Sequence, residues 1–194
     1  ARTELARLLG PWQMLAEDPA TEVSRSGRRS QQRAFGSQRR PVLSLYSVPV
    51  LSFWTRMLEE LPFSKDADET SVRLSVCCLR SARSYLSALG VERNEDVRLR
   101  VPSLHERLLQ QVTDRVRARP DAALLRRTAF QAFSAFLEHL PACVPSTEPF
   151  ASPLLSAAAK ETDDIVAIDA WNCFVRLISN DVSVDLDEEE ESPL

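Results

Sequence analysis

Apolar residues in this chain recur at helical spacing, and this pattern constrains the fold more than any other feature. In segment 47–62 they fall at i, i+3, i+4, i+7, i+8 and i+11, along one wide face of a helix. This stripe consists of Val50, Phe53, Trp54, Met57, Leu58 and Leu61. Pro49 lies in the first turn, where its missing N–H costs nothing, and Pro62 ends the segment. The pattern predicts a helix that packs against neighbouring elements.

The same kind of stripe occurs in three pairs of segments. In each pair a proline-started segment precedes a longer, more apolar one, and the pairs are 47–61 with 70–89, 102–118 with 121–140, and 151–160 with 163–179. In the last segment we expect these residues to face inward: Ile165, Ile168, Trp171, Phe174, Val175 and Ile178. The chain has only 4 glycines, which disfavours tight β-turns. We therefore predict an all-α protein of antiparallel helical pairs stacked as a short α-solenoid, with a compact helical bundle as the alternative.

The pairs also resemble a known class of repeats. Their spacing of roughly 45 to 55 residues is near the period of HEAT and armadillo repeats. The proline-started first helices, the Val- and Leu-rich second helices and the Arg within "FVRLI" resemble HEAT-type repeats. The run "VPVLSFWTRMLEEL", followed by an acidic loop and another long helix, is similar to mid-solenoid helices of the importin-β and exportin family. This resemblance implies a nuclear transport receptor or another large solenoid that holds partner proteins.

Charge and periodicity divide the chain into four regions. We expect an N-terminal helix or helix pair over 1–18, a flexible basic loop over 22–41, a helical-repeat domain over 42–180 and a disordered acidic tail over 181–194. The loop is predicted because no apolar period is sustained there. The tail is predicted because like charges repel one another.

Three groups of residues are candidates for binding a partner. The first group consists of the loop arginines Arg25, Arg28, Arg29, Arg33, Arg39 and Arg40. They are expected to bind an acidic protein partner or, alternatively, nucleic-acid phosphates. The second group consists of the tail acids Asp185, Asp187, Glu188, Glu189, Glu190 and Glu191. The third is the pair Phe53 and Trp54, which we interpret as part of the core, with an exposed aromatic anchor as the alternative.

The sequence offers little catalytic chemistry. It contains no phosphate-binding glycine loop and no metal-ligand spacing, and its two histidines, His105 and His139, lie near helix ends. The adjacent Cys77 and Cys78 point about 100° apart on a helix, so they are expected to be buried free thiols. No apolar run reaches the roughly 18 residues of a membrane span. We expect no cofactor, no metal, no small-molecule substrate and no membrane contact.

These observations predict a non-enzymatic protein–protein interaction scaffold within a larger assembly, in the nucleus, the cytoplasm or both. A segment of a nuclear transport receptor is one specific form of this prediction. A nucleic-acid-associated scaffold that uses the arginine-rich loop is the alternative. A thiol enzyme that uses Cys143 or Cys78 is the last alternative.

Overall fold

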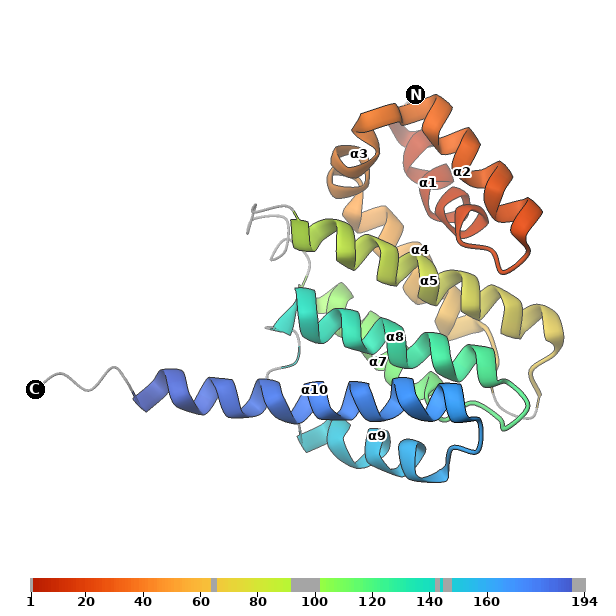
Figure 1. Cartoon of the computed structure of the whole chain (residues 1–194). Coiled ribbons are helices and arrows are strands. Elements are labelled where there is room, and N and C mark those ends of the chain that lie inside the picture. The colour runs from red at the N-terminus through yellow and green to blue at the C-terminus, as the bar shows by residue number, and fades with distance from the viewer. Residues whose placement is uncertain (1, 64–65, 92–101, 142–143, 145–147, 190–194) are drawn as a thin grey trace, which may run out of the picture.

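A computed structural model describes residues 2–63, 66–91, 102–141, 144 and 148–189. Helices dominate these residues, and no strand occurs among them. The helices lie roughly parallel or antiparallel to one another and form successive tiers from the N-terminal to the C-terminal end (Figure 1). The all-α prediction is confirmed.

The helices follow one another in chain order. Their bounds are α1 Arg2–Ala16, α2 Thr21–Phe35, α3 Arg39–Leu45, α4 Ser47–Glu60, α5 Glu69–Val91, α7 Pro102–Arg115, α8 Ala123–His139, α9 Glu148–Lys160 and α10 Asp164–Glu189. A short 3-10 helix, η1 (Gly36–Gln38), lies between α2 and α3.

The predicted pairs are α4 with α5, α7 with α8, and α9 with α10. The first helices contact one another in the order α4, α7, α9, and the second helices contact one another in the order α5, α8, α10. At the N-terminal end α1 packs on α2, α4 and α5. Because the extensive contacts join each pair to the next one, the fold is a short two-layered solenoid.

One continuous hydrophobic core runs through these pairs. Its largest aromatic members, Trp54, Tyr85, Phe130, Phe133 and Phe136, are fully buried. The indole N–H of Trp54 donates a hydrogen bond of 3.4 Å to the carbonyl oxygen of Gly10 in α1. Trp54 is therefore a core residue, as predicted. Its indole ring has no solvent exposure, and its N–H group has a hydrogen-bond partner inside the fold.

The segment predicted as a flexible basic loop is a helix instead. Most of it forms α2, which packs on α1 through small and polar residues rather than through an apolar stripe. Gly27 lies so close to α1 that an added Cβ would be 2.7 Å from the backbone nitrogen of Ala16. The Gln31 amide donates a hydrogen bond to the Trp12 carbonyl at 3.1 Å. The loop prediction is wrong because the search for apolar periodicity does not detect this kind of packing.

The prediction for the inner face of α10 is also wrong. The expected inward residues Ile165, Ile168, Trp171, Val175 and Ile178 are exposed, with exposed fractions between 43% and 62%, and only Phe174 is partly buried against the core. The residues that pack inward are Val166, Ala170, Cys173 and Leu177. α10 has two apolar faces, and the narrower one, with smaller side chains, packs against α8. No described helix covers the other face.

The expected disordered tail is helical over part of its length, because α10 continues to Glu189. Extending an existing helix is easier than nucleating a new one, and Glu has a good helix propensity. The backbone of the first four tail acids therefore lies in α10. Glu190 and Glu191 lie outside the described residues.

Candidate functional site

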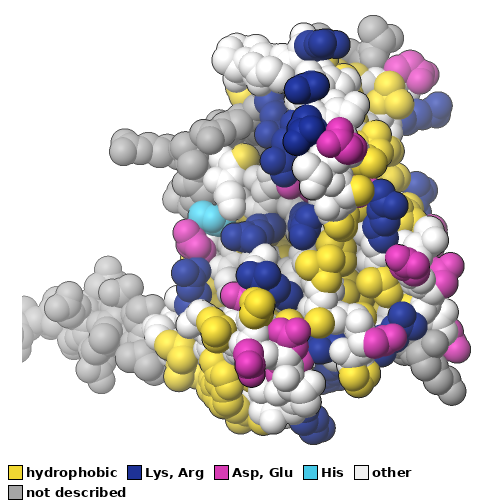
Figure 2. All heavy atoms as spheres, turned by 45° about the vertical axis from the view of Figure 1, so that its right-hand side comes forward, with side chains coloured by type: hydrophobic (Ala, Val, Ile, Leu, Met, Phe, Trp, Pro, Cys, Tyr) yellow, Lys and Arg dark blue, Asp and Glu magenta, His cyan; other side chains and the backbone are white. Residues whose placement is uncertain are grey.

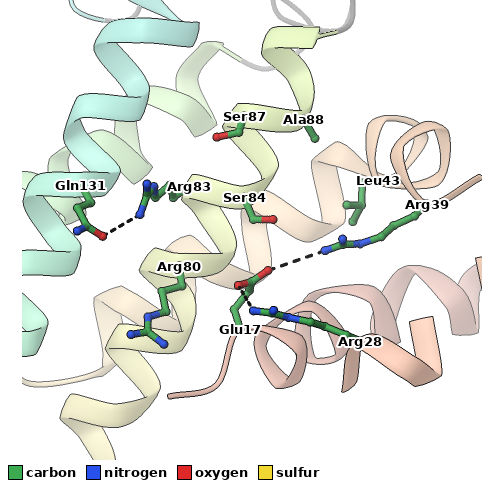
Figure 3. Close-up of a pocket in the computed structure, with 10 residues that line it drawn as sticks. All are labelled: Glu17, Arg28, Arg39, Leu43, Arg80, Arg83, Ser84, Ser87, Ala88 and Gln131. Carbon is green, nitrogen blue, oxygen red and sulfur yellow. Dashed lines mark hydrogen bonds and ion pairs between the residues drawn. The ribbon is translucent and has the colours of Figure 1, made fainter. Parts of the chain in front are cut away.

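The second helices border an open groove with a strong excess of arginine. It has a volume of about 570 Å³, and we define this arginine groove by six of its lining residues: Glu17, Arg28, Arg39, Arg80, Arg83 and Gln131. These residues come from α2, α3, α5, α8 and the end of α1 (Figure 3). Figure 2 shows Lys and Arg side chains gathered on the upper half of the face that it draws, where the N-terminal helices lie.

Arg28 and Arg39 form one side of the groove, and Glu17 lies between them. Arg28 Nη2 donates a hydrogen bond to Glu17 Oε2 at 3.5 Å, and Arg39 Nη2 lies 3.9 Å from Glu17 Oε1. Arg28 Nε also donates to the Ala16 carbonyl at 2.9 Å, and Arg39 Nη2 donates to Gln13 Oε1 at 3.1 Å. The hydrogen bonds that Arg28 donates to the backbone and Arg39 donates to Gln13 position both guanidinium groups at the groove.

The opposite side is one face of α5. Arg80, Arg83, Ser84 and Ser87 lie at i, i+3, i+4 and i+7, so their side chains project from the same side of the helix. Arg83 Nη1 donates to Gln131 Oε1 of α8 at 2.8 Å. No ion pair or hydrogen bond joins the Arg80 side chain to another described residue, and Figure 3 draws no interaction between it and the other residues of the groove.

A chain of side-chain contacts extends from the groove across the second layer. Gln131 Nε2 donates to Asp169 Oδ2 of α10 at 2.8 Å, and Arg127 Nε donates to the same carboxylate oxygen at 2.8 Å. α5, α8 and α10 are therefore joined by one polar network on this surface. A second groove of about 700 Å³ adjoins the first and shares Arg83 and Gln131 with it.

The structure divides the predicted arginines into two sets. Arg28 and Arg39 line the arginine groove, whereas Arg25, Arg29 and Arg33 line a separate depression on α2. Arg25 pairs with Glu22 on the same helix at 2.9 Å. Arg40 lies in α3, and its side chain is outside the described part of the structure. The side chains of the tail acids are outside it too.

The alternative reading as an exposed anchor is not supported for Trp54, whereas for Phe53, which lines another open groove, it stays a prediction. Trp54 has no solvent exposure, and Phe53 is partly buried against the core. A partner cannot contact the Trp54 ring unless the core opens.

The buried titratable groups are held in forms unsuited to proton transfer or nucleophilic attack at neutral pH. Burial raises the pKa of the Cys77 thiol to about 12 and also raises that of the Cys78 thiol. Burial lowers the pKa of His105 to about 4, and its ring stacks on Tyr85 at a centroid distance of 6.3 Å. Cys143, the other candidate for a thiol enzyme, lies outside the described residues. Cys77 and Cys78 are buried free cysteines as predicted, and Cys173 is a third.

The described residues contain no group of three or more His, Cys, Asp or Glu side chains placed to hold a metal ion. None of the helices in this part of the chain is both long and apolar enough to cross a membrane.

Sequence reasoning missed Arg80 and Arg83. The available signal was their i, i+3 spacing together with Ser84 and Ser87 on the polar side of the segment 70–89. That spacing predicts a shared helix face but does not show which elements lie opposite it. Only the packing of α1 and α3 on α5, with α2 packed on α1, brings the four arginines together.

The comparisons with known proteins identify one family. Residues 2–184 match the family model described as the N-terminal domain of the E3 ubiquitin-protein ligase listerin. No curated protein and no solved structure matches the chain.

This match corrects two expectations. The prediction that the protein is not an enzyme is wrong, because the matched family is defined on a domain of an E3 ubiquitin-protein ligase. The expected similarity to the importin-β and exportin family, and with it the nuclear transport function, has no support from the comparisons. The more general resemblance to helical-repeat proteins agrees with the stacked helical pairs.

Proposed function

The chain belongs to the family of listerin N-terminal domains, and on this premise we propose that it is a helical scaffold that holds a protein partner within a ubiquitin-ligase assembly. The arginine groove is the observation that carries the proposal. It lies on the second-helix layer, where stacked pairs form an extended surface of the kind that solenoids use to bind partners.

The groove is suited to binding because its charge is incompletely neutralised. Among the described residues that line it, Glu17 is the one carboxylate, and four are arginines. Exposed guanidinium groups readily form paired hydrogen bonds with carboxylates or phosphates of a partner. An intracellular location is part of the proposal, because ubiquitin transfer takes place inside the cell.

A capture experiment tests this function. The intact chain, immobilised through a tag, is incubated with nuclease-treated cell extract, and bound proteins are quantified by mass spectrometry. The Arg80→Glu/Arg83→Glu variant reverses charge in the groove, and Arg29→Glu/Arg33→Glu makes the same change in charge on the separate depression of α2. We expect a defined set of proteins, including components of ubiquitin transfer, that is lost with the groove variant and kept with the control.

Two results would contradict the proposal. Capture from untreated extract, run in parallel, that is absent from nuclease-treated extract would assign the surface to nucleic acid. Equal capture by the intact chain and both variants would place partner binding outside the arginine groove.

A further inference from the structure

The arginines of the groove differ in how far their charge is neutralised. Arg28 and Arg39 share the single carboxylate of Glu17 at 3.5 and 3.9 Å. Arg83 bonds to the neutral amide of Gln131 at 2.8 Å, and Arg80 has no ionic partner among the described residues. The charge is therefore least neutralised on the α5 side, where no described acid forms an ion pair with Arg80 or Arg83.

The charge changes sharply at the adjoining groove over α8 and α10. Both grooves share Arg83, and the acidic residues of the second groove are already paired with arginines, Asp169 with Arg127 at 2.8 Å and Glu138 with Arg176 at 3.0 Å. The lining of this second groove also includes Val175, whose exposed fraction is 54%. A ligand that continued beyond Arg83 would thus move from a basic surface onto a neutral and partly apolar one.

This pattern favours a peptide over a nucleic acid. A polynucleotide carries a charge at each phosphate and needs a basic track along its whole path, often with aromatic rings on which its bases stack. The arginine groove has no aromatic side chain among its described lining residues, and its basic surface ends after Arg83.

We infer that the arginine groove binds an acidic peptide segment of a protein partner, with the partner's carboxylates on Arg80 and Arg83. This inference rests on the proposed function and specifies the chemistry of its partner. Glu17 acts as an internal competitor in this arrangement, because it occupies Arg28 and Arg39 when no partner is bound. Residues that follow the acidic stretch of the partner lie over Val175 and need no negative charge.

Fluorescence polarisation with defined probes tests the inference. The probes are a fluorescein-labelled peptide with six consecutive glutamates, the same peptide with six glutamines, and a labelled oligouridylate of equal charge. The full chain is titrated at low and at near-physiological salt. We expect binding of the glutamate peptide, weaker binding of the RNA and no binding of the glutamine peptide.

Matched variants locate the site. The Arg80→Ala/Arg83→Ala variant loses two arginine–carboxylate pairs with the peptide. We expect this loss to weaken peptide binding by up to about tenfold. The control Arg29→Ala/Arg33→Ala loses the same charge and is expected to change it by less than about twofold, since distant exposed charges are screened. Glu17→Gln is expected to tighten binding. Circular dichroism establishes that each variant is folded.

Three outcomes would overturn the inference. In the first, the groove variant and the control weaken peptide binding equally. In the second, the chain binds the RNA more tightly than the glutamate peptide. In the third, neither Glu17→Gln nor the groove variant changes the affinity for the peptide. Groove-dependent capture of a protein from extract without any peptide binding would leave the proposed function standing and overturn only the acidic-peptide assignment.

Discussion

Arg126 of α8 and Glu161, in the connection between α9 and α10, form a bidentate ion pair in which both side chains are almost fully buried. Arg126 Nε donates to Glu161 Oε2 and Arg126 Nη2 donates to Oε1, each at 2.7 Å. Arg126 Nη1 also donates to the Pro120 carbonyl at 2.8 Å. The hydrogen bond from Arg126 lowers the pKa of Glu161. This pair connects the last two helical pairs of the solenoid.

Removal of either partner is expected to destabilise the fold. Arg126→Met or Glu161→Gln leaves a buried group unpaired, and we expect each to lower the free energy of unfolding by about 3 kcal/mol. The double variant Arg126→Met/Glu161→Gln should cost less than the sum of the single changes, because no unpaired charge remains. Urea denaturation of all four proteins measures this coupling. Strictly additive effects would show that the pair does not act as a unit.

Two tryptophans of the chain are expected to respond differently to truncation. Trp54→Ala removes a fully buried ring and should lower the free energy of unfolding by about 3–5 kcal/mol. Trp171→Ala removes a ring with an exposed fraction of 45% and should cost less than about 1 kcal/mol. Denaturant titrations compare the two variants, and similar losses would contradict the burial difference.

Because α1 and α2 approach closely at Gly27, adding one methyl group at this position is expected to lower the free energy of unfolding. In Gly27→Ala the new Cβ would lie 2.7 to 2.9 Å from backbone atoms of Leu15 and Ala16, so the helices must separate. We expect a loss of about 1–3 kcal/mol in the free energy of unfolding. The exposed neighbour change Ser26→Ala is the control and should have an effect within about 0.5 kcal/mol. Equal stability of both variants would exclude tight packing at this crossing.

His105 predicts a pH dependence of stability. Burial lowers its pKa from 6.5 to about 4, so the unfolded chain binds the proton more tightly than the folded one. Its contribution is complete above pH 6.5 and is lost as the pH falls towards 4, with a maximum of about 3 kcal/mol. Urea titrations from pH 7 to 4 measure it. His105→Phe keeps an aromatic ring beside Tyr85, and its stability should fall less over this interval; equal slopes would contradict the prediction.

The helical pairs could be predicted from sequence because their signals are local. The stripe that includes Val50 and Leu58 repeats with the helical period, and Pro49 and Pro62 bracket it. The same method placed Trp54 correctly in the core. It failed for α2, whose contact with α1 combines a glycine, a glutamine and the single aromatic pair Trp12–Phe35 and so gives no apolar period.

The candidate site could be predicted only in part. Arg28 and Arg39 were recognised because they lie in a cluster of like charges in the sequence. Arg80 and Arg83 were not, because their relation to that cluster arises from the contact of α3 with α5. Arg29 and Arg33 belong to the same sequence cluster but lie in a different depression of the surface.

By itself the sequence determined that the chain forms paired, amphipathic helices, because hydrophobic periodicity and prolines act over a few residues. Only the tertiary structure decided which face of α10 packs inward, since α10 has two apolar faces and contacts with α8 select one of them. It also decided that Arg28 and Arg80, 52 positions apart in the chain, border the same groove. Contacts between distant segments determine both results, and no local pattern encodes them.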